Sequence, residues 1–92
     1  MKERIMELGE RRRVTLVLWM EDGASFEPVQ PTWELSKTQE APETGTCEAV
    51  PDGARWQLTA EIQPESRGDY RLTYQFGLGT EIIRRSIPIR VV

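Results

Sequence analysis

The residues of this chain that could take part in covalent chemistry are few. Cys47 is the sole cysteine, and the 92 residues include no histidine. A thiol needs a nearby base or cation to become a nucleophilic thiolate, and the neighbouring Glu48 supplies neither. A single cysteine also excludes an internal disulfide and a multi-cysteine metal site. We therefore expect Cys47 to be a small buried hydrophobic residue on a short strand.

The sequence also lacks the short motifs that usually carry catalysis. It has no Ser-x-x-Lys or Gly-x-Ser-x-Gly pattern, no glycine-rich phosphate loop and no cluster of metal ligands. Glu21, Asp22 and Glu27 lie close together around an expected turn, but without the spacing of a calcium loop. A paired-carboxylate hydrolase would need a pocket on the order of several hundred cubic ångströms, for which so small a domain has little room. We expect a protein that is not an enzyme and that has no cofactor or metal ion.

Tryptophan residues offer chemistry for recognition, because their rings can stack on sugars or bases or anchor a protein interface. Trp33 and Trp56 alternate in phase with aliphatic neighbours, which predicts positions in the core. Trp19 is out of phase with Leu16 and Leu18, so we expect its ring to be exposed. An exposed tryptophan on a sheet more often marks a protein interface than a glycan site.

A basic run, Arg11, Arg12 and Arg13, precedes the first clear strand. Solvation at the end of a strand is the default interpretation, contact with an acidic partner surface comes next, and phosphate binding comes last. The net charge of −3 argues against a general nucleic-acid binder. These three arginines and Trp19 are the residues that we expect to contact a protein partner.

The charges are unevenly distributed along the chain. Residues 21–52 contain eight acids and one lysine, a net charge of −7, and the other residues carry eleven bases and seven acids, a net charge of +4. Ten of the twelve basic residues are arginine, which favours bidentate pairing with carboxylates at interfaces. Copies with an acidic middle and basic ends could associate head to tail, and the same charges could equally serve to solvate the sheet surfaces.

Strands must position these side chains, because alternation with a period of two dominates the sequence. Apolar and polar residues alternate over 56–63 and again over 70–76, which places one set on each face of a strand. Two strands of this kind indicate an antiparallel sheet that lies on a core. Further strands are expected over 12–20, 32–36, 46–50 and 80–92, with turns at 21–23, Glu-Asp-Gly, and 51–53, Pro-Asp-Gly.

The remaining segments complete an all-β chain. Residues 37–45 are polar and are expected to form a long exposed loop. Pro88 cannot donate a ladder hydrogen bond, so the last strand should lie at an edge or contain a bulge. Residues 1–8 fit a helical turn or a short edge strand, and residues 1–10 could form a loosely ordered arm. We expect residues 1–92 to form one antiparallel β-sandwich domain of about seven strands.

Nothing in the sequence indicates a membrane protein. No stretch approaches the roughly 20 apolar residues that a membrane-spanning helix needs. The first residues lack the uninterrupted apolar region and the small-residue cleavage site of a secretory signal. We therefore expect the protein to work where it is made, in the cytoplasm or within a particle such as a virion.

The segment SRGDYRL at 66–72 resembles the corner before the sixth strand of immunoglobulin-like domains, written there as Asp-x-Gly-x-Tyr-x-Cys. Gly68 and Tyr70 match this pattern, and Leu72 takes the place of the second cysteine. Trp33 is similar to the buried tryptophan of a middle strand in the same domains. The resemblance implies an immunoglobulin-like sandwich without the disulfide, in which the Tyr70 hydroxyl ties the corner.

The same resemblance assigns the Arg-Gly-Asp tripeptide at 67–69 to the corner rather than to integrin binding. The layout also resembles the small sandwiches of tailed-phage virions, which are tail, baseplate and decoration modules. A second similar layout is the accessory sandwich attached to α-glucan-processing enzymes. Because the chain opens at Met1 and contains no catalytic domain, we expect a structural or assembly subunit that binds a protein partner or its own copies. A carbohydrate-binding module is the alternative.

Overall fold

The computed structural model describes residues 3–19 and 27–92, and every regular element in these residues is a β-strand. The strands are β1 (Arg4–Met6), β2 (Arg12–Trp19), β3 (Val29–Ser36), β4 (Glu43–Thr46), β5 (Glu48–Asp52), β6 (Arg55–Ile62), β7 (Gly68–Leu78) and β8 (Glu81–Val91). The expected all-β class is confirmed. The described residues form eight strands, where about seven were expected.

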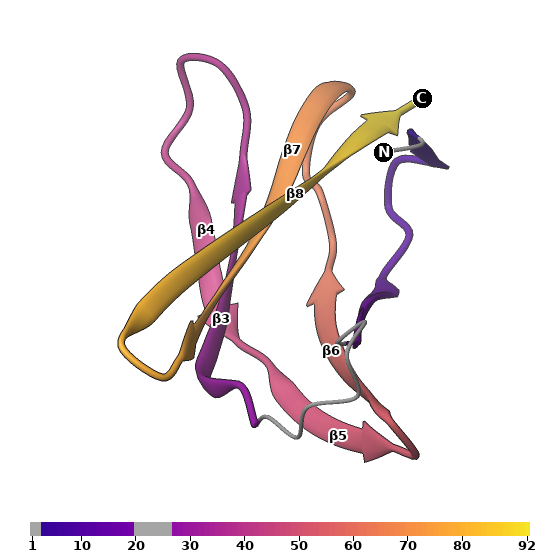
Figure 1. The fold of residues 1–92 in the computed structure, drawn as a ribbon. Coiled ribbons are helices and arrows are strands. Elements are labelled where there is room, and N and C mark those ends of the chain that lie inside the picture. Colours follow the sequence, from indigo (N-terminus) through magenta and orange to yellow (C-terminus); the bar gives the residue numbers. More distant parts are fainter. Residues whose placement is uncertain (1–2, 20–26) are drawn as a thin grey trace.

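The strands belong to two sheets. One is five-stranded, with the order β1-β8-β7-β3-β4, and the other is three-stranded, with the order β2-β6-β5. Neighbouring strands are antiparallel, apart from β1, which runs parallel to β8 with Arg4 opposite Ile89. Figure 1 shows β3, β4, β7 and β8 as one layer and β5 and β6 as part of the other.

One hydrophobic core is shared by the inner faces of the two sheets. The three-stranded sheet contributes Val14, Leu16, Leu58, Ala60 and Ile62, and the five-stranded sheet contributes Met6, Leu35, Leu72, Tyr74, Phe76, Ile87, Ile89 and Val91. The Tyr74 hydroxyl donates a hydrogen bond to the Val14 carbonyl and so links the sheets across the core. The alternation over 56–63 and 70–76 therefore predicted the inner faces of β6 and β7 correctly.

The tryptophans expected in the core are only half-buried. Trp33 packs against the core cluster at the side of the five-stranded sheet. Trp56 lies opposite Leu18 and Pro51 near one end of the three-stranded sheet. The period of two placed both rings on the inner faces, but it does not report where along a strand the opposite sheet ends.

The start of the chain forms a short strand, which was one of the two structures expected for residues 1–8. β1 pairs with residues 89–91 of β8, and Met6 is buried in the core. Backbone hydrogen bonds between Val92 and both Met6 and Leu8 continue this pairing. The last strand, expected at an edge, lies between β1 and β7 in the sheet order. Within the described part of the chain, its residues 81–88, which include Pro88, have β7 as their one neighbour, so this part of the strand is at an edge.

The middle of the chain differs from the expectation. Residues 43–45, expected in a loop, form β4 together with Thr46 because they pair with β3. The strand expected over 46–50 is broken at Cys47, whose N–H donates to the Pro31 carbonyl at 2.9 Å as the chain passes from one sheet to the other. β3 begins at Val29, earlier than expected, with a bulge before Thr32. The turn expected at 21–23 lies outside the described residues.

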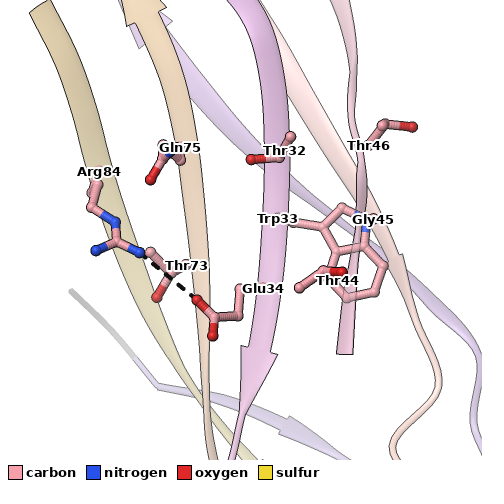
Figure 2. A pocket seen from close by; sticks show the side chains of 9 residues that line it. All are labelled: Thr32, Trp33, Glu34, Thr44, Gly45, Thr46, Thr73, Gln75 and Arg84. Carbon is pink, nitrogen blue, oxygen red and sulfur yellow. Dashed lines mark ion pairs between the residues drawn. The ribbon is translucent and has the colours of Figure 1, made fainter. Parts of the chain in front are cut away.

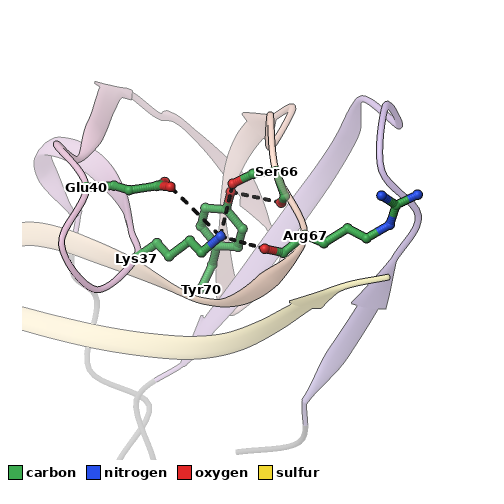
Figure 3. Close-up of polar contacts among 5 residues, drawn as sticks. All are labelled: Lys37, Glu40, Ser66, Arg67 and Tyr70. Carbon is green, nitrogen blue, oxygen red and sulfur yellow. Dashed lines mark hydrogen bonds and ion pairs between the residues drawn. The ribbon is translucent and has the colours of Figure 1, made fainter.

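The corner before β7 contains the hydroxyl tie that was expected of Tyr70. Its hydroxyl donates to the Ser66 carbonyl at 3.0 Å and lies 2.8 Å from the Ser66 hydroxyl. Lys37 reaches over the Tyr70 ring and donates to the Ser66 hydroxyl at 3.0 Å and to the Arg67 carbonyl at 2.5 Å, as Figure 3 shows. Gly68 has φ 132°, and a Cβ there would lie 2.9 Å from the Lys37 side chain. These contacts hold the loop against the end of β3.

Candidate functional site

Apolar side chains are exposed on the outer face of the three-stranded sheet, which we call the β2–β6–β5 face. In β2, the residues that alternate with buried Val14 and Leu16 point away from the core. Trp19 is 62% exposed and Val17 is 41% exposed. Val50 of β5 lies on the same face and is 42% exposed. The exposure predicted for Trp19 is therefore confirmed.

The strand register arranges this face in four rows. Read from β2 through β6 to β5, they are Trp19 with Arg55 and Asp52, Val17 with Gln57 and Val50, Thr15 with Thr59 and Glu48, and Arg13 with Glu61. The valine row thus lies next to the end row of Trp19, Arg55 and Asp52, and charges of both signs occur at the two ends of the face. A mixture of a large aromatic residue, aliphatic residues and arginine is typical of protein interfaces.

Polar contacts hold parts of the β2–β6–β5 face in place. The Arg55 guanidinium lies over the Trp19 ring, with 5.7 Å from its central carbon to the ring centroid, which is a cation–π contact. Gln57 Nε2 donates to Asp52 Oδ2 at 3.3 Å. A partner that binds Trp19 would therefore contact an indole ring that already has the Arg55 guanidinium over one of its faces.

The three consecutive arginines do not form one cluster. Arg13 belongs to the β2–β6–β5 face together with Trp19, because both are odd-numbered residues of β2. Arg12 alternates to the other side and pairs with Glu10, with 3.1 Å between Nε and Oε2. Arg11 pairs with Glu61 at 3.7 Å. Of the three, Arg13 extends directly from the strand into the candidate contact surface.

The centre of the outer face of the five-stranded sheet is polar, and the apolar residues Ile5, Val29 and Ile82 are exposed towards its ends. A shallow pocket of about 380 Å³ lies there, lined by Thr32, Trp33, Glu34, Thr44, Gly45, Thr46, Thr73, Gln75 and Arg84 (Figure 2). Glu34 and Arg84 form an ion pair of 3.8 Å across it. The Trp33 ring lies against Gly45, where an added Cβ would be 2.6 Å from the indole. Hydroxyl and amide groups can bind a polar ligand here, but this lining has neither a thiol nor an imidazole to act as a catalytic nucleophile or base.

Cys47 lies between β4 and β5 and packs against the core. Burial raises the pKa of its thiol to about 11. The residue is therefore a neutral thiol near pH 7. It is only partly buried and lies between two strands, whereas the sequence predicted a buried position on a strand.

The Arg-Gly-Asp tripeptide lies at the corner before β7, and part of the acidic group considered for calcium binding lies outside the described residues. In the Arg-Gly-Asp tripeptide, the Arg67 carbonyl accepts a hydrogen bond from Lys37, and Asp69 pairs with Arg90 at 3.4 Å. Residues 3–19 and 27–92 contain no group of three side chains that could hold a metal ion, and Glu21 and Asp22 lie outside them. In the same part of the chain no helix is long and apolar enough to cross a membrane.

No family model matches this chain, and no curated protein or solved structure matches it either. The description of the β2–β6–β5 face therefore rests on the exposure and the strand register of its residues alone. Sequence reasoning found Trp19 and Arg13 on it but missed Val50. The sequence contained one signal for Val50, because Glu48, Val50 and Asp52 alternate with Ala49 and Pro51. This alternation was not recognised because the strand was expected over 46–50, whereas β5 spans Glu48–Asp52.

Proposed function

We propose that this protein is a non-enzymatic structural or assembly subunit that acts through protein–protein contacts of the β2–β6–β5 face. The observation that carries the proposal is the joint exposure of Trp19, Val17 and Val50 at 62%, 41% and 42% on one side of one sheet. Tryptophan and arginine are enriched among the residues that dominate the energetics of protein interfaces. Arg13 and Glu61 at one end of the face would help to orient the partner.

The fold that we propose for this function is an immunoglobulin-like sandwich without the disulfide. The order β2-β6-β5 against β8-β7-β3-β4 supports it, because strands B, E and D face strands G, F, C and C′ in variable-type domains. The Tyr70 hydroxyl contact with Ser66 supports it as well. Leu72, in the place of the second cysteine, is buried, and of the two residues that could stand at the first cysteine position, Leu16 is buried and Val17 is exposed.

The setting that we propose is a particle such as a tailed-phage virion, in which the chain is a tail, baseplate or decoration module. The layout of strands and turns in the sequence supports this setting. A contact surface with apolar, basic and acidic rows also fits a subunit whose work is assembly.

Site-specific photo-crosslinking tests the proposal. Benzoylphenylalanine replaces Val17 in the cells that naturally produce the protein, and a matched variant carries it in place of Ser86, which is exposed on the other sheet. We expect position 17 to give one defined protein adduct, identified by mass spectrometry, that a further Trp19→Ala substitution abolishes. Equal adducts from positions 17 and 86, or none from position 17, would contradict a contact function of this face.

A second candidate function is carbohydrate binding, which the exposed ring of Trp19 favours because sugars stack on such rings. Titration with α-glucans while tryptophan fluorescence is followed would detect it, with Trp19→Phe as the control that removes only the exposed indole. A saturable change lost in that variant would support a glycan site. An unchanged spectrum over a range of glycans would exclude it.

A further inference from the structure

The backbone of β2 is unpaired along one side within the described part of the chain, where β6 is its single neighbour. The strand has eight residues and contains neither proline nor glycine. Residues 81–88 of β8 are also unpaired on one side, but this stretch ends at Pro88, which has no N–H to donate, and β1 pairs with the rest of the strand. The remaining edges are shorter or interrupted: β1 has three residues, β4 has four, and β5 has five with Pro51 among them. Unpaired N–H and C=O groups make a long edge strand a template for another strand.

We propose that the partner is a second copy of this chain, and that the two copies pair antiparallel along β2 around Leu16. The two three-stranded sheets would then form one continuous sheet. This inference rests on the proposed function, because it names a partner that contacts the β2–β6–β5 face along its β2 border. A two-fold axis gives a closed dimer rather than an open chain of copies.

The register follows from the side chains of β2. A two-fold axis at Leu16 places Arg13 of one copy opposite Trp19 of the other, and Thr15 opposite Val17. Residues opposite one another in an antiparallel pair point to the same face, so all of these lie on the β2–β6–β5 face. If the register of the β2–β2 pairing shifted by one residue, outward-facing residues of one copy would lie opposite inward-facing residues of the other. The outer faces of the two three-stranded sheets would then no longer be continuous.

This register is favoured over an axis at Thr15 or Val17 by charge and apolar complementarity. The Trp19 row would read Asp52, Arg55 and Trp19 from one copy and then Arg13 and Glu61 from the other. Each guanidinium group would have a carboxylate beside it, and the indole would lie between two cations. By symmetry this row forms twice, at both ends of the contact.

The inner side of the strand fits the same axis. Leu16 would lie opposite Leu16 of the second copy, and Val14 opposite Leu18. Val14 and Leu16 belong to the core cluster, and Leu18 packs against it. Apolar residues of the two copies would therefore be neighbours on the core side of the new sheet, and Thr15 would be next to Val17 on its outer side. The complementarity lies within a single strand, which is why a second copy fits it.

Analytical ultracentrifugation over a range of concentrations tests the dimer. We expect the wild-type chain to dimerise reversibly, and Trp19→Ala and Arg13→Glu each to raise the dissociation constant by about tenfold or more. Arg71→Glu is the matched control, because it makes the same charge change on the exposed face of the other sheet. A wild-type chain that stays monomeric, or a dimer that both substitutions leave intact, would overturn the proposal.

Mixed-chain disulfide formation tests the register in a Cys47→Ala background. Under mild oxidation, Thr15→Cys and Val17→Cys chains should cross-link when mixed and not when each is alone, because residue 15 faces residue 17 of the other copy. Cross-linking of either variant alone would contradict the axis at Leu16. If photo-crosslinks from position 17 identify another protein while the chain is monomeric, the proposed function stands and the second copy is wrong. If those cross-links are also absent, both fail.

Discussion

Tyr70 shows how a single hydroxyl fixes a loop in this protein. Its hydrogen bonds to Ser66 join the corner to the start of β7, and Lys37, which directly follows β3, also donates to the Ser66 hydroxyl. We expect Tyr70→Phe to lower the free energy of unfolding by about 1–2 kcal/mol, because the Ser66 groups lose their partner. Urea denaturation measures this change. Thr73→Val, which removes an exposed hydroxyl from the same strand, is the control and should change stability by less than about 0.5 kcal/mol.

The Trp33 ring depends on the absence of a side chain at Gly45. A Cβ at this position would lie 2.6 Å from the indole, so Gly45→Ala must displace the ring. We expect a loss of about 1–3 kcal/mol in unfolding free energy and a changed near-ultraviolet circular dichroism spectrum. In a Trp33→Leu background the same substitution should cost much less. An equal cost in both backgrounds would show that the indole contact is not the cause.

Cys47 and Tyr74 should make the protein less stable at alkaline pH. Burial raises the pKa of both groups, that of Cys47 from 9.0 to about 11. A group whose pKa is raised in the folded state contributes stability that is fully present below its unfolded pKa and is lost as the pH rises through its folded pKa. The unfolding free energy should therefore fall between about pH 9 and 11. Cys47→Ala should flatten this decline, and an unchanged slope in that variant would contradict the assignment.

Elements with a strong period of two were predictable from sequence, and elements defined by distant partners were not. The strand expected over 12–20 corresponds to β2 at Arg12–Trp19, because its successive residues alternate between the core side and the outer side of the sheet. β4 is polar and short, and only its pairing with β3 makes it a strand. The break at Cys47 depends on a hydrogen bond to Pro31 that no local pattern encodes. Val50 could not be assigned to the β2–β6–β5 face from sequence for the same reason, since it joins Trp19 and Arg13 there through sheet register.

β1 is a short element whose contribution can be separated from the rest of the fold. Met6 is 1% exposed in the core, whereas Ile5 on the same strand is 59% exposed. Met6→Ala should therefore lower the unfolding free energy by about 2–5 kcal/mol, and Ile5→Ala by less than about 0.5 kcal/mol. Thermal or urea unfolding measures both. Equal and small effects would mean that β1 does not dock on β8 in solution.

At the scale of the whole molecule, the two sheets have different outer surfaces. The five-stranded sheet presents threonine, glutamine and paired charges around a shallow pocket, with Ile5, Val29 and Ile82 exposed towards its ends. The three-stranded sheet presents Trp19 and two valines in adjacent rows, with charged residues at both ends. The free edge of β2 borders the second surface. A subunit that associates through this side would keep its polar sheet exposed, so assembly need not bury the pocket.

The contact function that we propose for the β2–β6–β5 face has a direct test in hydrogen–deuterium exchange. Exchange would be compared between the isolated chain and the complex that the photo-crosslinks identify, whether its partner is a second copy or another protein. We predict slower exchange of the amides of β2 in the complex, with no change in residues 81–88, the other long unpaired edge. Protection confined to the five-stranded sheet, with β2 exchanging at the same rate in both samples, would contradict the account.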